Sequence, residues 1–343
     1  MASEKITSLQ VAARAGVSQS AVSRAYTPGA SVSKKTIEKV KKAAAELEYR
    51  PNVLARAMVS GKSRIIGLVV AYLNNQFYPD ALEKLSTVLQ ERGYHVLIFM
   101  ASNSEKSIDN VIDEILDYQV DGIIAASVSL SSDLADRCRS AGVPAVLFNR
   151  SLGDAKMSSV TSDNLSGGRK VADYLLKTGH KKIAFIAGWD GASTQRDRER
   201  SFIDRLKEDG MSLHARGVGN FNSDQASDAV RKMFDCDVSD RPDAIFVAND
   251  HMAFAVMDTL RFELGLSIPD DVSIIGYDDV PVAAWQAYNL TTVRQPANRM
   301  VTETVDLLLA AIEQPESDVR QIEIDGPLVI RGSARVIEGW DHE

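Results

Sequence analysis

From residue 65 to about residue 314, short apolar runs alternate with amphipathic segments of helical length. Continuous runs of Val, Ile, Leu and Ala are typical of parallel strands that are buried on both faces. A helix usually connects each such strand to the next, so the pattern predicts an α/β fold of doubly wound parallel sheets. The pattern occurs in two successive runs, divided near residue 163, and therefore predicts two lobes of similar build.

The first run contains predicted strands at 65–71, 95–101, 122–126 and 145–148, and predicted helices at 78–92, 105–118 and 131–141. The second contains strands at 182–188, 244–248 and 273–276, and helices at 166–178, 195–209, 223–235 and 250–264. Three stretches are predicted to cross between the lobes: 160–163, 290–295 and 321–330. A helix at 298–314 is predicted to return to the first lobe. We therefore assign residues 65–162 and 294–320 to the first lobe and residues 163–291 and 321–343 to the second.

Two lobes joined by several crossings enclose a cleft, and ligands of such sheets bind at the carboxyl ends of the strands. The side chains expected there are Asn74, Asn75, Gln76, Phe77, Tyr78, Asn149, Arg150, Arg196, Arg198, Phe221, Asn249, Asp250, Tyr277, Asp278 and Asp279. Amides and carboxylates hydrogen-bond to hydroxyl groups, while aromatic rings cover C–H faces. This composition favours a sugar site.

Some of these residues have an alternative role. Asp278 and Asp279 are adjacent at a strand end, where successive side chains point apart, which disfavours a catalytic acid pair. Asp250 is expected to cap the helix beginning at residue 251 in preference to contacting a ligand. Phe77 and Tyr78 either belong to the core or contact the ligand. The sequence lacks a metal-ligand pattern, a recognisable catalytic triad, a P-loop and a dinucleotide fingerprint. An enzyme, a metal site and a cofactor are therefore not expected.

The segment 7–26 has the pattern of two short helices joined by a tight turn. Thr7 and Ser18 stand at the predicted N-caps, and Gly16 allows the positive φ that ends the first helix. The small apolar residues of the second helix, Ala21, Val22 and Ala25, are predicted to pack inward. Its outward face then consists of Gln19, Ser20, Ser23 and Arg24. Glutamine and arginine can read base edges in a major groove, and hydroxyl groups can bind phosphates.

A third helix is predicted over 33–48, with Ser33 as its N-cap. It carries the outward lysines Lys34, Lys35, Lys39, Lys41 and Lys42. Residues 1–64 hold 12 Lys and Arg against 4 Asp and Glu, a balance of +8, although the whole chain has a formal charge of −8. A basic head on an acidic chain is typical of a DNA-binding domain. We expect a helix-turn-helix domain at 1–50, a hinge and linker at 51–64, and a core at 65–343.

The chain has no apolar segment long enough to cross a membrane and no apolar signal core near its start, so a cytoplasmic protein is expected. Cys138 and Cys236 are far apart and are interpreted as two reduced cysteines. Only ten residues follow Ser333 and they contain no apolar heptads, so a dimer formed through the lobes is expected, without a coiled-coil tail.

The chain resembles the LacI/GalR family of transcriptional regulators, the family of the lac repressor, over essentially its whole length. The resemblance is carried by VAARAGVSQSAVSRAY, YRPNVLARAMVSGKSRIIGLVV, VDGIIAAS, VTSDNLSGG, GHKKIAFIAG, FVANDHMA, VSIIGYDD, LTTVRQP and PLVIRGS. It implies a homodimer that binds a near-palindromic DNA operator, with a small effector in the cleft changing the affinity for DNA. Sugars and sugar acids are the expected effectors, and a nucleobase is the alternative.

The resemblance also implies roles for single residues. Bases are read by Gln19, Ser20 and Arg24; phosphates are bound by Thr7, Ser18 and Ser23; the hinge contacts DNA through Asn52, Ala55 and Met58; and the effector is bound by Phe77, Asn149, Arg198, Phe221, Asn249 and Asp278. Two departures are visible. Gln10 replaces a usual aspartate and is expected to perturb a helix cap, and Met58 replaces a usual leucine that wedges into the minor groove.

The segment 52–59 is too short to form a stable helix alone, and we expect it to fold only where two copies meet on DNA. A free sugar-binding protein with the same two lobes is the principal alternative, and an enzyme built on those lobes is a second one. The basic head argues against the first alternative, and the absence of convergent carboxylates argues against the second.

Overall fold

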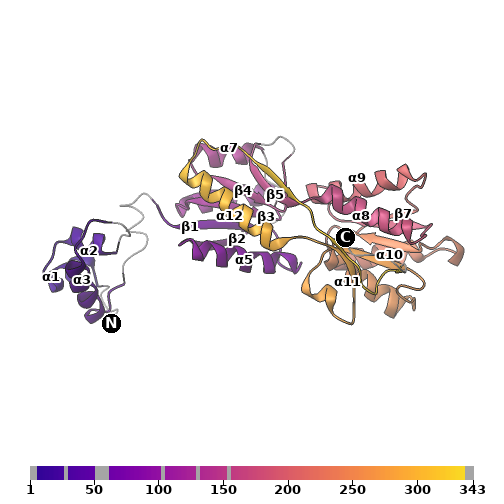
Figure 1. Cartoon of the computed structure of the whole chain (residues 1–343), viewed down its shortest axis with the longest axis horizontal. Coiled ribbons are helices and arrows are strands. Elements are labelled where there is room, and N and C mark those ends of the chain that lie inside the picture. The colour runs from indigo at the N-terminus through magenta and orange to yellow at the C-terminus, as the bar shows by residue number, and fades with distance from the viewer. Residues whose placement is uncertain are drawn as a thin grey trace. The chain divides into compact units, whose positions relative to one another are not determined.

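The computed structural model describes residues 6–26, 30–50, 62–101, 105–128, 132–152 and 156–336. The chain divides into two compact units, Met1–Arg64 and Ile65–Glu343 (Figure 1). The expected hinge contacts Asn52, Ala55 and Met58 lie outside the described residues. Within the described residues, no helix is long and apolar enough to cross a membrane.

The first unit contains the three helices expected from the sequence: α1 (Ser8–Ala15), α2 (Gln19–Ala25) and α3 (Lys34–Glu46). They surround a small core of Val11, Ala12, Val22, Val40, Ala43 and Ala44. Gly16 ends α1 at a φ of 63°, a conformation that glycine adopts without a steric penalty. The predicted N-caps Thr7, Ser18 and Ser33 are confirmed, since each side chain accepts a hydrogen bond from a backbone N–H of its helix.

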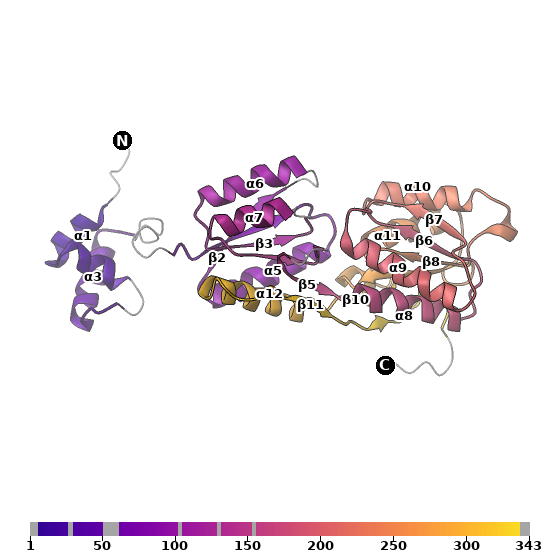
Figure 2. The ribbon, with the colours of Figure 1, turned by 90° about the horizontal axis from the view of Figure 1, so that it is seen from above.

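The first lobe of the larger unit is built on a six-stranded parallel sheet in the order β11-β5-β4-β3-β1-β2. Its strands are β1 (Ile65–Val70), β2 (His95–Met100), β3 (Gly122–Ala126), β4 (Ala145–Phe148), β5 (Ser158–Ser162) and β11 (Gln321–Ile324). Figure 2 shows α6 (Glu105–Asp117) and α7 (Ser132–Ser140) on one face of the sheet, and α5 (Phe77–Glu91) and α12 (Ala297–Glu313) on the other. Separate apolar cores fill the two sides.

The second lobe has a six-stranded sheet in the order β12-β10-β9-β8-β6-β7. Its strands are β6 (Ile183–Ala187), β7 (Ala215–Val218), β8 (Ala244–Val247), β9 (Ser273–Asp278), β10 (Thr291–Arg294) and β12 (Leu328–Val329). Among them β12 runs antiparallel to β10, and the other pairs are parallel. The covering helices are α8 (Asn164–Lys177), α9 (Ser193–Glu208), α10 (Ser223–Phe234) and α11 (Asp250–Asp258), which continues as a π-helical turn, Thr259–Glu263. The doubly wound α/β architecture is confirmed.

The structure differs from the sequence-based assignment near the third crossing. Residues 321–343 were assigned to the second lobe, but β11 pairs in parallel with β5 of the first sheet, with Gln321 beside Ser159. The last crossing therefore lies between β11 and β12. The sequence QIEI has an alternating pattern that suits an edge strand but does not indicate which sheet it joins. The edge strand β7 was not predicted because its sequence, ARGV, contains a charge and a glycine.

Candidate functional site

The outward face of α2 has the composition that the sequence predicts. Gln19, Ser20, Ser23 and Arg24 are exposed, whereas Val22 faces the core. Three of these side chains make hydrogen bonds: Gln19 Nε2 donates to Ser8 Oγ of α1 at 3.0 Å, Arg24 Nε donates to the Ser20 carbonyl at 3.3 Å, and the hydroxyl groups of Ser18 and Ser20 lie 3.0 Å apart. Such bonds on an exposed face are readily exchanged for bonds to another polar partner, because water competes for them throughout. The face is therefore available for recognition.

The N-terminus of α1 contradicts one expectation. Gln10 was expected to perturb the cap, but its Oε1 accepts from the Thr7 backbone N–H at 2.8 Å while the Gln10 N–H donates to Thr7 Oγ1 at 3.4 Å. These reciprocal bonds form a capping box, in which a glutamine at the third helical position is a favoured residue. Gln10 therefore completes the cap. Thr7, the expected phosphate contact, is exposed at this helix end.

In the larger unit, three expected effector contacts adopt a backbone conformation that is unusual for residues other than glycine. The φ angles are 57° at Asn149, 59° at Phe221 and 132° at Asp278, and each residue ends or closely follows a strand. Asp279 also has a positive φ, of 56°. Backbone strain of this kind costs free energy and is concentrated at binding and catalytic sites. The backbone is therefore strained at the carboxyl ends of β4, β7 and β9, where the ligand is expected to bind.

Asp278 is the carboxylate that connects the two lobes. It is buried, and its Oδ1 accepts from Gln295 Nε2 at 2.6 Å and lies 3.8 Å from Arg198 Nη1. Its Oδ2 accepts a long hydrogen bond, of 3.5 Å, from Asn75 of the first lobe. Burial raises the pKa of Asp278, and the Arg198 charge and the hydrogen bonds from Gln295 and Asn75 oppose that rise. The expected pair of Arg198 and Asp278 is thus brought together.

Arg198 is held by further fixed partners. Its Nε donates to Asn164 Oδ1 at 2.8 Å and its Nη1 donates to the Ala248 carbonyl at 2.7 Å. The guanidinium also stacks on the Tyr277 ring, 3.5 Å from the ring centre. These contacts leave Arg198 little freedom to move. Tyr277 was expected at this strand end, whereas nothing in the local sequence of Asn164 separates it from ordinary core residues.

The residue pair that follows β4 forms a second buried cluster. Asn149 Nδ2 donates to the Tyr78 hydroxyl at 3.2 Å, and Arg150 Nη1 donates to the Asn149 carbonyl at 2.7 Å. The Arg150 guanidinium lies 5.9 Å from the centre of the Phe221 ring. It also reaches across the lobes, since its Nη1 donates to Thr194 Oγ1 at 3.0 Å. Asn149 and Phe221 are therefore placed together through Arg150.

The remaining expected effector contacts have structural partners of their own. Asn249 is the N-cap of α11, because its Oδ1 accepts from the Met252 N–H at 3.0 Å. The expectation that Asp250 provides this cap was wrong: Asp250 is fully buried and accepts from the Val280 N–H and the Thr292 hydroxyl. Burial, reinforced by the Asp278 charge, raises the pKa of Asp250. Phe77 packs in the first-lobe core and also lines a groove.

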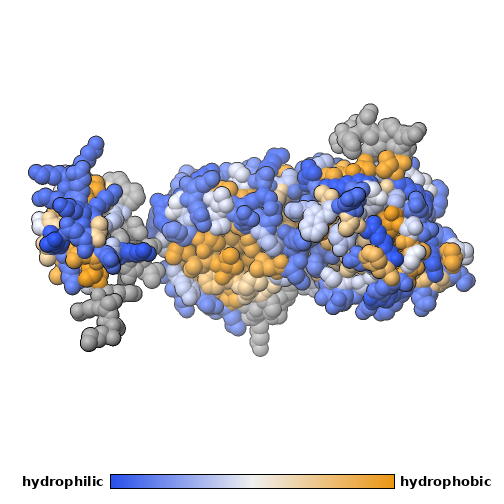
Figure 3. Space-filling view, turned by 90° about the horizontal axis from the view of Figure 1, so that it is seen from below, coloured by the Kyte–Doolittle hydropathy of each residue, from blue (hydrophilic) through white to orange (hydrophobic). Residues whose placement is uncertain are grey.

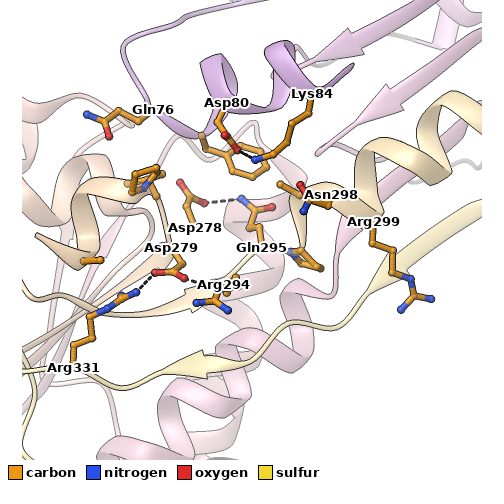
Figure 4. A pocket seen from close by; sticks show the side chains of 16 residues that line it. Gln76, Asp80, Lys84, Asp278, Asp279, Arg294, Gln295, Asn298, Arg299 and Arg331 are labelled. Carbon is orange, nitrogen blue, oxygen red and sulfur yellow. Dashed lines mark hydrogen bonds and ion pairs between the residues drawn. The ribbon is translucent and has the colours of Figure 1, made fainter. Parts of the chain in front are cut away.

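This groove has a volume of about 570 Å³ and lies between α5, α12 and the end of β9 (Figure 4). Its lining includes Gln76, Phe77, Asp80, Lys84, Asp278, Asp279, Arg294, Gln295, Asn298, Arg299 and Arg331. Figure 4 shows Asp278 bonded to Gln295, whereas Asp279 is turned toward Arg294 and Arg331, each at 2.6 Å. Because the two adjacent aspartates face different partners, their geometry does not suit a catalytic acid pair. Gln295 was not among the expected contacts, although it directly follows β10.

Comparison with known families gives two matches, one in each unit. Residues 9–52 match the family model described as bacterial regulatory proteins, lacI family. Residues 172–334 match a periplasmic binding protein-like domain.

The chain is also similar to characterised repressors over nearly its full length. It is 31% identical to the HTH-type transcriptional repressor PurR of Vibrio vulnificus (strain CMCP6), over 95% of this chain and 98% of that protein. It is 28% identical to the ribose operon repressor of Escherichia coli (strain K12), over 96% and 99% of the two chains.

Two solved structures have the same architecture. One is the lac repressor dimer bound to operator and the anti-inducer ONPF, with a TM-score of 0.86 and 26% identity, covering 97% of this chain and 100% of that one. The other is the complex of the transcriptional regulator CelR with cellobiose, with a TM-score of 0.72 and 31% identity, covering 96% and 100%.

Proposed function

Because the chain belongs to the LacI family of bacterial regulatory proteins and is a DNA-binding transcriptional repressor, we propose that it binds a near-palindromic operator as a homodimer and is switched by a small effector between the lobes. The observation that carries the proposal is the exposed polar face of α2, on a helix whose N-terminus is capped by Ser18. A helix of this kind inserts its N-terminal residues into the major groove.

In this proposal the residues of the first unit divide their work on DNA. Gln19, Ser20 and Arg24 read base edges, and Thr7, Ser18 and Ser23 bind phosphates. The five lysines of α3 are all exposed and add long-range attraction to the phosphate backbone. Phosphate contacts place the helix, and base contacts give the sequence preference.

The test uses an operator that the wild-type protein selects from randomised duplex DNA. Arg24→Ala is expected to weaken operator binding by about 1–3 kcal/mol and to relax the base preference at one position, because a bidentate arginine–guanine contact is lost. Arg14→Ala is the matched control, since this exposed arginine pairs with Glu46 at 2.6 Å instead of facing outward from α2. Fluorescence anisotropy measures both variants. An unchanged base preference in Arg24→Ala contradicts the proposed reading face.

A homodimer is supported by an edge of the first sheet that is apolar and open. In β2, which ends that sheet, Ile98 and Met100 are 55% and 51% exposed. Figure 3 shows apolar side chains gathered on this side of the first lobe, where Figure 1 places α5 and β2. An exposed apolar edge strand is normally avoided in a monomer because it invites pairing with another chain. We assign this edge to the contact between the two copies.

Analytical ultracentrifugation tests the dimer. Ile98→Asp is expected to shift the protein toward monomer, because it places a charge in an apolar interface. Val218→Asp is the control: Val218 is 40% exposed on β7, the edge strand of the second sheet, and its substitution is expected to leave the dimer intact. Dimers of equal stability in both variants would argue against the β2 edge.

The switch is proposed to act through the angle between the lobes. A ligand that bridges Arg198 or Asp278 to the first-lobe residues Asn149 and Arg150 would favour one angle, and that angle would bring together or separate the two copies of 52–59 on DNA. Coupling between such sites is typically about 1–3 kcal/mol. Hydrogen exchange provides the test, with residues 52–59 expected to gain protection on operator. Equal protection with and without operator would remove the hinge from the switch.

A further inference from the structure

Arg150 is a buried cation whose partners, among the described residues, are all neutral. The residue is 3% exposed. Its guanidinium donates to the Asn149 carbonyl, to Thr194 Oγ1 and, at 3.5 Å, to the Tyr72 hydroxyl. Its Nε is buried and has no hydrogen-bond partner. A buried charge without a counter-charge is expensive, so such a group is expected where a ligand of opposite charge binds.

The second positive group at this place is the N-terminus of α9. Thr194, which contacts Arg150, is the second residue of this 16-residue helix. No side chain caps the helix at Ala192, and its first turn contains no acidic residue. The first N–H groups of a helix lack partners within the helix and carry a partial positive charge, which makes this end suitable for an anion. Arg150 and the α9 terminus therefore place two positive groups side by side, which favours the binding of an anion there.

The nearby carboxylates do not fully neutralise these positive groups. Asp278 lies 3.8 Å from Arg198, and the charge of Arg150 also lowers its pKa, so a single carboxylate is shared between two buried arginines. Asp250 bonds to the Val280 N–H and to Thr292, away from Arg150. Burial also favours the uncharged form of Asp250, since its pKa is raised. The cleft therefore keeps an excess of positive charge beside Arg150.

Among the described residues, two further buried atoms at the strand ends of the cleft lack a partner, and both are hydrogen-bond acceptors. They are Asn149 Oδ1, next to Arg150, and Gln295 Oε1, which belongs to the groove of Figure 4. Both residues use their amide N–H groups, on Tyr78 and on Asp278. An acceptor of this kind is satisfied by an O–H or N–H donor and not by an anionic oxygen. The cleft thus offers positions for hydrogen-bond donors, such as hydroxyl groups, in addition to an anion.

Resting on the proposed function, we propose that the effector is a small polyhydroxylated anion, whose carboxylate or phosphate binds between Arg150 and the N-terminus of α9 and whose hydroxyl groups bond to Asn149 and Gln295. A guanidinium binds either anionic group through two parallel hydrogen bonds. The arrangement selects against a neutral sugar and against a neutral purine, because both leave the charge of Arg150 uncompensated.

The experiment measures binding to the full-length protein by calorimetry with matched compounds. The carboxylate set is gluconate and galacturonate, the phosphate set is glucose 6-phosphate and ribose 5-phosphate, and the neutral set is glucose, galactose and ribose; hypoxanthine and guanine are added. Inorganic phosphate and acetate probe the anion position alone. At least one polyhydroxylated anion is expected to bind at least about thirtyfold more tightly than its neutral parent. This ratio is at the lower end of the affinity losses found when one partner of a buried charge pair is removed. The set containing that compound distinguishes carboxylate from phosphate.

Variants locate the effect. Arg150→Met is expected to lose at least about thirtyfold in affinity for the anion while changing affinity for the neutral parent little, and Arg150→Lys to retain part of the preference because it keeps the charge. Arg92→Met is the control, since Arg92 is exposed and pairs with Asp306 at 3.0 Å. A loss shared equally by anion and neutral parent in Arg150→Met indicates a structural residue and overturns the proposal.

Binding of these compounds to the wild-type protein tests the proposed effector class even if Arg150→Met fails to fold. Binding of a neutral sugar or a purine as tightly as the matched anions overturns the proposal, and so does the absence of any anion binding. If such a neutral compound still changes operator affinity, the proposed function stands and only the effector class is wrong. If the wild-type protein selects no operator, the proposed function itself fails.

Discussion

The recognition face of α2 and the cleft between the lobes are two polar surfaces built in opposite ways. On α2 the polar side chains are exposed, and their hydrogen bonds reach α2 itself, its cap and the adjacent helix α1. In the cleft Asn149, Arg150, Arg198 and Asp278 are at most 4% exposed, and their partners come from distant parts of the chain. A polar group costs little at the surface but must be matched by a partner in the interior. The head therefore tolerates substitution, whereas the cleft does not.

The largest expected effect follows from this difference. Arg198→Ala should lower the free energy of unfolding of the core by about 3–5 kcal/mol, because it leaves Asp278 buried without its counter-charge. Arg24→Ala on α2 should change stability by less than about 0.5 kcal/mol. Chemical denaturation followed by circular dichroism measures both. Equal and small effects would mean that the cleft is as adaptable as the head.

The second effect is a pH dependence confined to the cleft. The raised pKa of Asp250 means that the folded protein binds a proton there more tightly than the unfolded chain does. Its contribution to stability is complete below about pH 4, the ordinary value of an aspartate, and is lost as pH rises through the raised value, at about 1.4 kcal/mol per pH unit. Asp250→Asn should remove this slope.

Asparagine suits that position sterically, since its Oδ1 can accept from the Val280 N–H and its amide can donate to the Thr292 hydroxyl. The measurement is the denaturation midpoint from pH 4 to pH 9. Asp278→Asn is the comparison variant, which should reduce the Asp250 part of the slope without removing it, because burial is the larger cause of the raised pKa of Asp250 and the Asp278 charge the smaller one. If the stability of the wild-type protein and that of Asp250→Asn changed with pH in the same way over this interval, Asp250 would be ionised throughout.

The smallest effect belongs to the head. Ser18→Ala removes the cap of α2 and should cost about 1 kcal/mol in stability. Ser23→Ala is the control, because this exposed serine is the fifth residue of α2, about one turn beyond the cap. If the first unit melts separately, thermal denaturation of the full chain measures its stability. If it does not, hydrogen exchange of the α2 amides measures the order of that helix. Identical exchange in both variants would remove Ser18 as the source of helix order.

The same contrast explains what the sequence could predict. The caps at Thr7, Ser18 and Ser33 and the outward face of α2 follow from rules that relate residues three or four positions apart, and they were predicted correctly. The contacts of Arg150 with Thr194 and of Asp278 with Asn75 join segments 44 and 203 positions apart, and no local pattern determines them. The residue types at the strand ends were foreseen, but their pairing was not.

Two wrong expectations have the same origin. The residues around Asn249 and Asp250 offer two possible caps at adjacent positions, and only the packing of β9 and β10 decides that Asp250 is buried against Val280 and Thr292. Likewise, the sequence of β11 is compatible with the edge of either sheet. In the structure β11 follows α12 of the first lobe and pairs with β5 of the same lobe. Tertiary context settled both cases.

The most direct test of the account measures operator affinity with and without the compound of the panel that binds the wild-type protein most tightly. The wild-type affinity is expected to change by between about fivefold and a hundredfold, in keeping with typical coupling between two sites. Asp278→Ala is expected to keep its operator affinity and lose the response, because the cleft and α2 are separate surfaces. Two results would contradict control of the head by the cleft. In the first, the compound leaves the operator affinity of the wild-type protein unchanged. In the second, Asp278→Ala abolishes operator binding while the protein remains folded.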